Sequence, residues 1–254
     1  MVLDARISRE DLAKTLAYCH RTYLPEWTSS DVELEIARGK YLDLRSPSRP
    51  TPSRLYKMWP AKHADNLVKL GIIRLNPALY FTTVEAPAIK DEREAAFIEC
   101  GIGVERIVVN ASTIGRHSLL FCTTTDRSVR FEGYDSCVEV TNPEGFLSEL
   151  SNALQLRSAA SGANRLMQVG HSRCSYQHSR VVVGPMHGFN EHLVKLGEIS
   201  WDTINILSPQ KFFIKGADNQ PEREYRMVFT MEFDVTGPVD LEIKKLSDYC
   251  RRLF

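Results

Sequence analysis

Short apolar runs separated by turn residues fill the chain after residue 54, and they predict more strands than long helices. Runs rich in β-branched and apolar residues, bounded by glycine, proline, asparagine or aspartate, are typical of strands. The predicted strands cover residues 55–59, 72–75, 104–110, 118–125, 137–141, 171–183, 211–215, 222–234 and 239–244. The predicted helices cover residues 61–70, 91–100, 143–156, 189–196 and 246–253. This irregular order predicts an α+β fold with mixed or mainly antiparallel sheets, because a doubly wound parallel sheet would need strands and helices to alternate.

Residues 1–45 have a helical pattern instead. Ser8 with Asp11 three residues later is a capping-box pattern, and apolar residues follow it at helical spacing. Ser30 with Glu33 marks the start of a second helix. Residues 46–53 are rich in proline and serine, which cannot continue a helix and are typical of a linker. We therefore expect an N-terminal helical extension (1–45), a linker (46–53) and a main domain (54–254).

Composition places the chain among ordinary globular proteins, since 43% of its 254 residues are hydrophobic and 25% are charged. Lys+Arg and Asp+Glu both number 32, so the formal net charge is zero. That balance excludes a globally basic nucleic-acid binder, but it leaves room for a local basic groove. No apolar run approaches the ~18 residues that a membrane span needs, and no apolar core of a secretory signal follows the N-terminus. We expect a cytoplasmic protein that does not contact membranes.

Motifs for the common cofactor and metal chemistries are missing. The sequence has no P-loop, no G-x-G-x-x-G, no H-E-x-x-H and no G-x-S-x-G. Its 6 cysteines are scattered without a C-x-x-C pair, and its 7 histidines have no metal-ligand spacing. We therefore expect free thiols and no metal site.

The most informative segment runs from Glu222 to Arg226, at the start of a strongly predicted strand. Because side chains alternate along a strand, Glu222, Glu224 and Arg226 share one face. One carboxylate of such a pair can bind a ribose hydroxyl and stabilise a cationic sugar centre, while the other can orient or deprotonate a nucleophile. The alternative is a solvated strand face with a charge pair, which is common on protein surfaces.

Two earlier segments carry complementary chemistry. The predicted strand over residues 118–125 ends in three threonines, whose hydroxyls can bind a ligand or support a carboxylate. The alternative explanation is the ordinary preference of threonine for strands. Residues 54–60 place two cations among aromatic side chains, a combination that suits a pyrophosphate and flat rings. The alternative there is a core aromatic pair beside an exposed lysine.

In this order, the three segments resemble the motifs of the ADP-ribosyltransferase superfamily, in its Arg/Ser-Thr-Ser/Glu-x-Glu branch. In that branch the first motif holds NAD, the second braces the site, and the last glutamate drives the transfer. Here Lys57 stands where the branch has arginine or histidine, and Thr123, Thr124 and Thr125 replace Ser-Thr-Ser. The resemblance implies split sheets of mixed or antiparallel strands with NAD in the cleft between them, preceded by the helical lead-in.

Further positions resemble a group of bacterial proteins of this superfamily, several of which belong to phage-defence or toxin–antitoxin loci. The group includes a toxin that ADP-ribosylates messenger RNA. Leu55, Tyr56 and Lys57, with His63 and Gly71 downstream, also resemble the opening of members that modify DNA. The other matching positions, within a resemblance that spans about residues 54–234, are Ile73, Arg74, Leu75, Tyr80, Glu85, Asp91, Glu94, Phe121, Cys122 and Thr123.

The resemblance implies an NAD-dependent mono-ADP-ribosyltransferase that consumes NAD as its substrate. It implies a bacterial toxin or phage-defence effector, with RNA favoured over DNA or protein as the acceptor and an antitoxin as a candidate partner. The implied catalytic residues are Glu224, which stabilises the oxocarbenium-like transition state, and Glu222, which orients the acceptor. The implied NAD-binding residues are Arg54, Lys57 or Arg74 for the pyrophosphate, Tyr56 or Tyr80 for the nicotinamide, and Thr123 and Thr124 as braces of the site.

Two alternatives stay open. The first is a non-catalytic module with the same fold that binds a nucleotide or a partner, which Lys57 in place of arginine favours. The second is a metal-dependent nuclease that uses Asp91, Glu92 and Glu94, of which Asp91 and Glu94 share one face of the predicted helix. Carboxylates near a helix N-terminus are also ordinary complements of the helix dipole.

Overall fold

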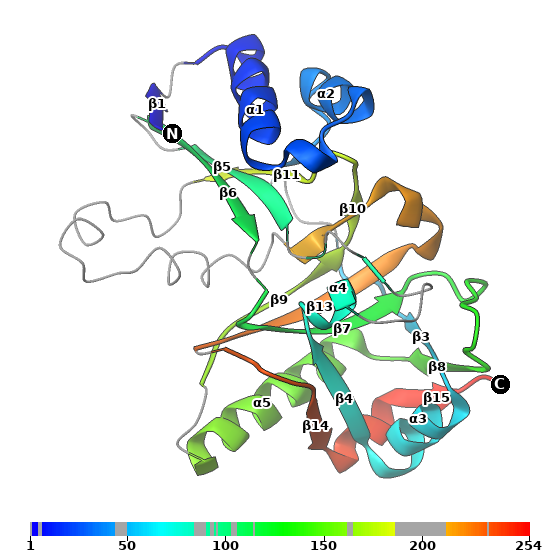
Figure 1. Cartoon of the computed structure of the whole chain (residues 1–254). Coiled ribbons are helices and arrows are strands. Elements are labelled where there is room, and N and C mark those ends of the chain that lie inside the picture. The colour runs from blue at the N-terminus through cyan, green and yellow to red at the C-terminus, as the bar shows by residue number, and fades with distance from the viewer. Residues whose placement is uncertain are drawn as a thin grey trace.

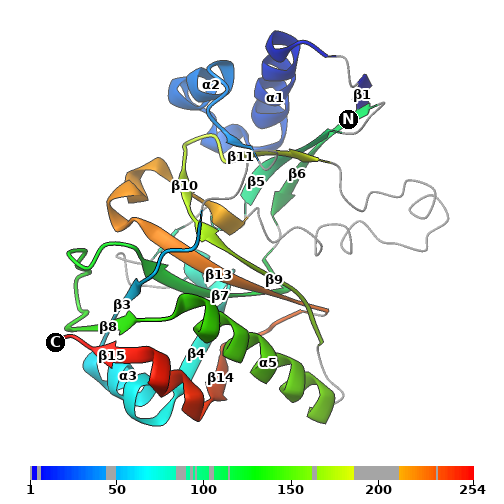
Figure 2. The same cartoon turned by 180° about the vertical axis from the view of Figure 1, so that it is seen from behind.

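The computed structural model describes residues 2–4, 7–43, 50–83, 90–91, 94, 96–102, 106–113, 115–161, 165–185, 212–232 and 234–254. The structure has two main β-sheets, one above the other in Figure 1, and each has its own hydrophobic core. The smaller sheet carries the N-terminal helices, and the larger sheet packs against a long helix and the C-terminal segments (Figure 2). The predicted α+β class with mostly antiparallel strands is therefore confirmed.

The larger sheet contains eight strands, and all of its strand pairs are antiparallel. It comprises β3 (Leu55–Trp59), β4 (Ile72–Pro77), β7 (Ser118–Thr124), β8 (Ser136–Val140), β9 (Leu166–Arg173), β13 (Glu224–Met231), β14 (Val239–Glu242) and β15 (Cys250–Arg252). β7 pairs with β3, β4 and β13, so it joins segments that are far apart in the sequence. β13 is buried along its whole length because it lies between β7 and β9.

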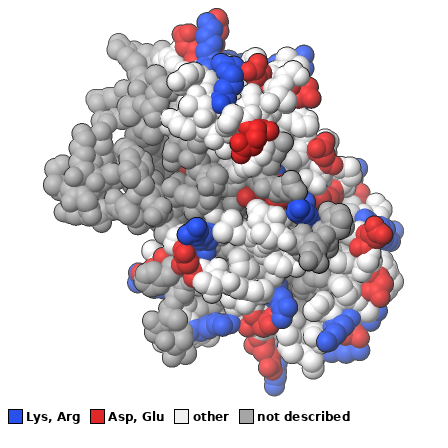
Figure 3. All heavy atoms as spheres, viewed as in Figure 1, with Lys and Arg blue, Asp and Glu red and all other residues white. Residues whose placement is uncertain are grey.

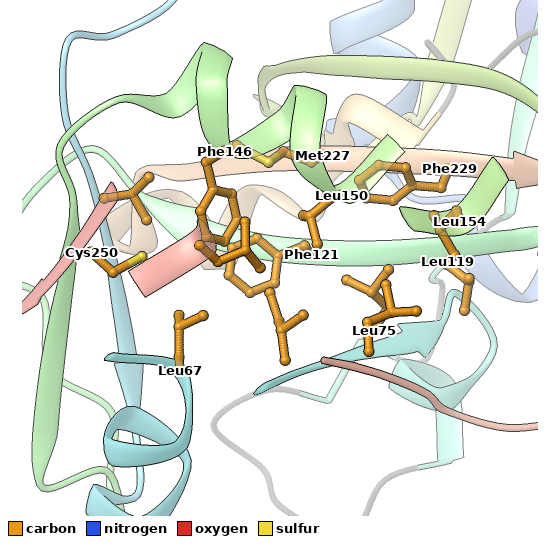
Figure 4. Packing of buried hydrophobic residues seen from close by; sticks show 14 of the residues in the cluster. Leu67, Leu75, Leu119, Phe121, Phe146, Leu150, Leu154, Met227, Phe229 and Cys250 are labelled. Carbon is orange, nitrogen blue, oxygen red and sulfur yellow. The ribbon is translucent and has the colours of Figure 1, made fainter. Parts of the chain in front are cut away.

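Helix α5 (Pro143–Ser161) covers one face of the larger sheet (Figure 2). Its residues Phe146, Leu150 and Leu154 recur every four positions, so they lie on one face of the helix. Figure 4 shows these side chains packed over the sheet, where the ring centroids of Phe121 and Phe146 lie 5.4 Å apart. This packing fixes the orientation of β7 and β13, the two central strands.

The predicted helix over residues 61–70 is confirmed as α3 (Ala61–Asp65) followed directly by the π-helical turn η2 (Asn66–Leu70). Gly71 ends it in the left-handed conformation, with φ 67°, as glycine commonly does at this position. A Cβ atom at Gly71 would lie 2.2 Å from the carbonyl oxygen of Ile243, just before the 3-10 segment η5 (Lys244–Tyr249). Both the φ angle and this close approach therefore require glycine.

The smaller sheet has the order β1-β6-β5-β11-β2. Its strands are β1 (Val2–Asp4), β6 (Arg106–Thr113), β5 (Ala96–Ile102), β11 (Val181–Pro185) and β2 (Leu42–Asp43), and β11 is parallel to both neighbours. The N-terminal helices that cover it are α1 (Arg9–Tyr23) and α2 (Ser30–Ala37), joined by the 3-10 turn η1 (Pro25–Trp27). Leu16 and Ile36 of the helices share a buried cluster with Ile98 and Val181 of the sheet.

Ser8 caps α1 as predicted, whereas Ser29 and not Ser30 caps α2. The three-part division of the chain stays a prediction. The structure adds that the N-terminal helices share one core with strands from the predicted main domain.

Short elements lie between the two sheets (Figure 1). β10 (Ser175–Tyr176) pairs in parallel with β12 (Ile214–Lys215), and the 3-10 turn η4 (Ala217–Glu222) leads from β12 to β13. The short helix α4 (Tyr80–Thr83) follows β4. These elements bring parts of both sheets close to the start of β13.

Two of the predicted helices are wrong. The second half of the segment 91–100 belongs to β5, because its apolar residues are buried and pair with β6 and β11 on both sides. Sheet pairing therefore outweighs the helical propensity of the preceding charged residues. The segment 246–253 ends as β15, which pairs with β8, after the 3-10 turn η5.

Several of the predicted strands are shorter or divided. The segment 171–183 contains parts of β9, β10 and β11, and Arg180 adopts a left-handed conformation (φ 48°) directly before β11. The segment 211–215 is reduced to β12. The predictions that lie outside the described residues are the helix over 189–196, residues 46–49 of the linker, Glu85 and Glu92. No helix within the described ranges is both long and apolar enough to cross a membrane.

Gly71→Ala should lower the free energy of unfolding more than Gly133→Ala. Both glycines have positive φ (67° and 79°), and the left-handed conformation costs an alanine about 1–2 kcal/mol at either position. At Gly71 the added methyl group also meets the backbone of Ile243, whereas nothing lies within 4 Å of it at Gly133. Urea unfolding of the two variants measures the difference, and equal losses would contradict the close approach at Gly71.

Candidate functional site

A cavity of about 480 Å³ opens beside the junction of β3, β4, β7 and β13. Its volume is within the range of small-molecule sites, roughly 300–1,000 Å³. Its aromatic lining includes both tyrosines predicted to stack on a ring and comprises Tyr56, Trp59, Tyr80, Phe81, Phe121, Phe131 and Tyr134. Its charged lining comprises Lys57, Lys62, Arg74, Glu94, Lys215, Glu222, Glu224, Arg226 and Asp240.

The outer surface has a different charge pattern. On the face in Figure 3, Lys and Arg side chains of the described residues are interspersed with Asp and Glu. No patch of a single sign gathers among the described residues on that face. The cavity, by contrast, combines charged and aromatic side chains in its lining.

Three neighbouring strands bring the predicted motifs to this cavity. Tyr56 of β3 pairs with Thr124 of β7, and the same threonine pairs with Glu224 of β13 on its other side. Lys57, which follows Tyr56, is close enough to Glu224 and Glu222 for their negative charges to act on its pKa. Residues that are far apart in the sequence thus form two walls of one cavity.

Glu224 is buried, and both of its carboxylate oxygens accept hydrogen bonds from cations. Arg226 Nε donates to Oε1 at 2.5 Å, and Lys215 Nζ donates to Oε2 at 2.8 Å. Burial alone would raise the pKa of this carboxyl group, but Arg226 and Lys215 outweigh burial and hold the pKa of Glu224 well below its ordinary value. Glu224 is therefore ionised throughout the neutral pH range.

Glu222 reaches the same lysine from outside the strand. The prediction that it begins β13 is wrong, because Glu222 is the last residue of η4 and Arg223 takes a left-handed conformation (φ 47°). Its carboxylate nevertheless accepts a hydrogen bond from Lys215 and lines the cavity with Glu224 and Arg226. Burial, together with the negative charge of Glu224, raises the pKa of Glu222 to about 7 despite the nearby lysine. Glu224 therefore keeps its charge while Glu222 titrates near neutral pH.

Lys215 is a functional candidate that the sequence analysis missed. Its side chain is only 6% exposed and bridges the two glutamates. Burial would lower the pKa of Lys215, but Glu224 and Glu222 outweigh burial and raise it above its ordinary value. The available signal was its position directly after the apolar residues 212–214, where a charged side chain is buried and needs a partner.

Lys57 projects from β3 into the cavity. Its ammonium group donates to the carbonyl oxygen of Cys122 at 2.7 Å and lies 5.2 Å from the ring centroid of Trp59 and 5.4 Å from that of Phe121. Burial lowers the pKa of Lys57, and the negative charge of Glu224 acts in the opposite direction. Within the described residues, no carboxylate forms an ion pair with this ammonium group.

The other two candidate cations have carboxylate partners. Arg54 does not line the cavity, and its Nη1 donates to Glu139 on β8 at 2.9 Å. Arg74 lines the cavity, but its Nε and Nη2 each donate to Asp240 at 2.8 Å. Of the three cations considered for a pyrophosphate, Lys57 is the one whose charge has no such partner in the described structure.

Two of the three threonines of the middle motif, Thr123 and Thr124, line the cavity. Thr123 Oγ1 donates to the backbone carbonyl of Tyr225 at 2.9 Å, which ties β7 to β13. Thr124 Oγ1 accepts a hydrogen bond from the backbone N–H of Asp126 at 3.0 Å, which holds the turn after β7. Both contacts stabilise the strands that present Glu224.

Two acidic residues of the nuclease alternative, Asp91 and Glu94, form ion pairs with arginines. Nη2 of Arg180 lies 2.6 and 2.5 Å from the two oxygens of Asp91. Nη1 and Nη2 of Arg226 donate to the two oxygens of Glu94 at 2.7 and 2.8 Å. Across the described ranges, no three His, Cys, Asp or Glu side chains are grouped to hold a metal ion. The predicted helix that would have aligned these carboxylates is also not formed.

No protein-family model, no curated protein and no solved structure matches this chain. The function is therefore argued from the residues and geometry of the cavity.

Glu222→Gln should change the pH dependence of stability. Because folding raises the pKa of Glu222 to about 7, the folded protein binds a proton between about pH 4.5 and pH 7 that the unfolded chain has released. This glutamate therefore makes the free energy of unfolding fall as the pH rises through that window, and the glutamine variant lacks this contribution. Urea unfolding at about pH 5 and about pH 8 should show the variant gaining stability relative to the parent protein at the higher pH.

The exposed residue Glu242 provides the matched control for this measurement. Glu242→Gln should leave the pH dependence as it is in the parent protein. If the stability difference between Glu222→Gln and the parent is the same at both pH values, Glu222 does not titrate near neutral pH.

Proposed function

We propose that the chain is an NAD-dependent mono-ADP-ribosyltransferase. The observation that carries this proposal is the distribution of charge in one cavity, with Lys57 on one strand and ionised Glu224 two strands away. NAD needs both signs, because its pyrophosphate is anionic and its nicotinamide ring is cationic. The aromatic side chains of the cavity supply flat surfaces for its rings.

The residues predicted to bind NAD have different roles in this proposal. Lys57 neutralises pyrophosphate charge, and Tyr56 or Tyr80 stacks on the nicotinamide ring. Thr123 and Thr124 hold β7 against β13 and the following turn, so they fix the position of the catalytic strand. Arg54 receives no role, because it lies outside the cavity, and Arg74 reaches only the part of the cavity beside Asp240.

The reaction replaces one glycosidic bond with another. The bond between C1′ of the nicotinamide ribose and the ring nitrogen breaks, and its electron pair leaves with nicotinamide, which becomes neutral. The ionised carboxylate of Glu224 stabilises the positive charge that develops on the ribose. A nucleophilic oxygen or nitrogen of the acceptor then bonds to C1′ and gives up its proton. Glu222 orients the acceptor and, with its pKa near 7, can accept that proton.

The proposal extends to the fold family and the setting. We extend the proposal to the split-sheet ADP-ribosyltransferase fold, because the three motifs, in that order along the chain, meet on β3, β7 and β13 of the larger sheet. The implied setting is a cytoplasmic bacterial toxin or phage-defence effector with a macromolecular acceptor, RNA before DNA or protein, and an antitoxin partner. This setting is carried by the sequence resemblance.

A second candidate is a non-catalytic module that binds a nucleotide in the same cavity. The observation in its favour is that both oxygens of Glu224 already accept hydrogen bonds from Lys215 and Arg226. A carboxylate held in this way can be a structural ion pair. NAD binding without transfer distinguishes this module from the enzyme.

Glu224→Gln should abolish transfer and preserve NAD binding. The parent protein, incubated with biotinylated NAD and separate pools of RNA, DNA and protein, should label one pool, with RNA expected. The variant should lose at least about 100-fold of this label, because the charge that stabilises the transition state is removed. Circular dichroism and calorimetric NAD binding check that the variant is folded. Undiminished labelling would exclude Glu224 as the catalytic residue, and NAD binding by the parent without any label would support the non-catalytic module.

Lys57→Met should weaken NAD binding by about tenfold, which is the loss of one charge-assisted contact. Arg54→Met is the matched control, because it removes the same charge three residues away at a side chain outside the cavity. Isothermal titration calorimetry with NAD should give the parent Kd for the Arg54 variant. Equal losses in both variants would argue against a specific role for Lys57.

A further inference from the structure

Arg226 is the largest fully buried side chain of the described structure, and its guanidinium group is shared between two carboxylates. Its Nε faces Glu224, whereas Nη1 and Nη2 form a two-pronged pair with Glu94. Nη1 also donates to the backbone carbonyl of Phe212 at 2.7 Å. All three nitrogens of the guanidinium group are therefore hydrogen-bonded.

Glu94 decides which edge of this guanidinium faces Glu224. A guanidinium group prefers to hold a carboxylate with two parallel hydrogen bonds, through its two terminal nitrogens or through Nε and one terminal nitrogen. Glu94 holds the two terminal nitrogens, which leaves the Nε edge of the guanidinium group facing Glu224, where Nε donates one hydrogen bond. Without Glu94, the guanidinium group could turn its terminal pair toward Glu224, which would move the carboxylate away from Lys215.

The segment that carries Glu94 is itself held in place. The backbone N–H of Glu94 donates to the carbonyl of Asp91 at 2.9 Å, and the N–H of Asp91 donates to the carbonyl of Phe81 at 2.8 Å. The carboxylate of Asp91 is held by Arg180, a buried residue at the left-handed turn before β11. Asp91 and Glu94 are thus held by α4, by the turn before β11 and by β13.

Stability alone does not account for this arrangement. A buried ion pair contributes little net stability, because the loss of hydration offsets the attraction between the charges. One carboxylate would neutralise the charge of Arg226, yet Arg226 has two. The second carboxylate requires Lys215 as an additional counter-charge.

We infer that Glu94 is a positioning residue, which acts through Arg226 to keep one oxygen of Glu224 on the guanidinium Nε and the other on Lys215. This inference rests on the proposed transfer reaction, in which Glu224 stabilises charge on the ribose. It goes further by assigning a role to a residue that lies 130 positions from the catalytic strand. Glu94 is not a catalytic residue in this account, because it acts on the reaction only through Arg226.

The test compares Glu94→Gln with Glu139→Gln. Glu139 is an equally buried carboxylate, held by Arg54 and Arg251, that does not line the cavity. NAD affinity is measured by calorimetry. The rate of transfer is measured in a single turnover with biotinylated NAD and the pool of RNA, DNA or protein that the parent protein labels. Glu94→Gln should keep the Kd for NAD within about threefold and lower the rate about 10- to 100-fold, since small displacements of a catalytic group have effects of that size. Glu139→Gln should lower the melting temperature but leave the rate within about twofold of the parent.

Glu94→Ala extends the comparison to three proteins in which residue 94 accepts progressively fewer hydrogen bonds. The amide oxygen of glutamine still accepts one hydrogen bond from Arg226, whereas alanine accepts none, so the rate should fall in the order parent, Gln, Ala. A folded Glu94→Gln variant with the parent rate would overturn the inference, as would an equal loss of rate in Glu139→Gln. If both Glu94 variants fail to fold while Glu139→Gln folds, Glu94 is a structural residue and the inference is also rejected.

A second measurement separates this inference from the proposed function. Carbon-13 NMR of glutamate carboxyl groups identifies Glu224 as the signal that is lost in Glu224→Gln. Glu94→Gln should shift this signal, and Glu139→Gln should leave it in place. If the parent protein transfers no label, the proposed function fails, but a shift specific to Glu94→Gln still supports positioning. An unshifted signal would reject positioning whatever the parent protein does with NAD.

Discussion

The charge of Arg226 is buried, and much of the cavity wall is arranged around it. An unpaired ion in a protein interior costs several kcal/mol, so the chain has to supply counter-charges at this point. Glu224 comes from the same strand, Glu94 from the segment before β5, and Lys215 balances the second negative charge. Because these residues belong to different parts of the chain, the wall forms only when the segments around both sheets are in place.

Other charged residues also need a counter-charge, and these ion pairs determine which cations are available to a ligand. Glu139 forms an ion pair with Arg54, and Asp91 forms one with Arg180. Each of these pairs removes an arginine from the set of candidate ligand-binding groups. Lys57 is different, because its ammonium group is held by a carbonyl and two aromatic rings, none of which carries a negative charge. The aromatic strand β3 therefore presents an amine that forms no ion pair with a carboxylate among the described residues.

Much of the fold could be predicted from the sequence where the signal was local. Alternation and apolar runs identified β3, β7 and β8, and the cap at Ser8 identified the start of α1, because these features involve a few adjacent residues. The segment 91–100 was assigned wrongly, since its strand partners come from β6 and β11 and no local pattern contains them. The start of β13 was placed two residues too early, because nothing in the sequence marks the left-handed conformation of Arg223.

The residues of the candidate site also fall into those that the sequence predicts and those that it does not. Glu222, Glu224 and Arg226 were expected to meet, and they do, although Glu222 arrives from a 3-10 turn. Lys215 lies only seven and nine residues from Glu222 and Glu224, but the sequence does not show that its side chain is buried between them. The contact between Glu94 and Arg226 joins segments 132 residues apart, which no local pattern contains. Burial of a charged residue is visible only after the chain has folded around it. An isolated cation next to an apolar run is the one local sign of it.

The interspersed charges on the face in Figure 3 also bear on how a ligand arrives. Fields from neighbouring charges of opposite sign cancel within a few ångströms in salt solution, where the screening length is about 8–10 Å. An anion that approaches over this face would therefore be attracted only at short range. For such an approach, recognition would depend on contacts inside the cavity, with Lys57 and the aromatic rings, and the rate of association would change little with ionic strength.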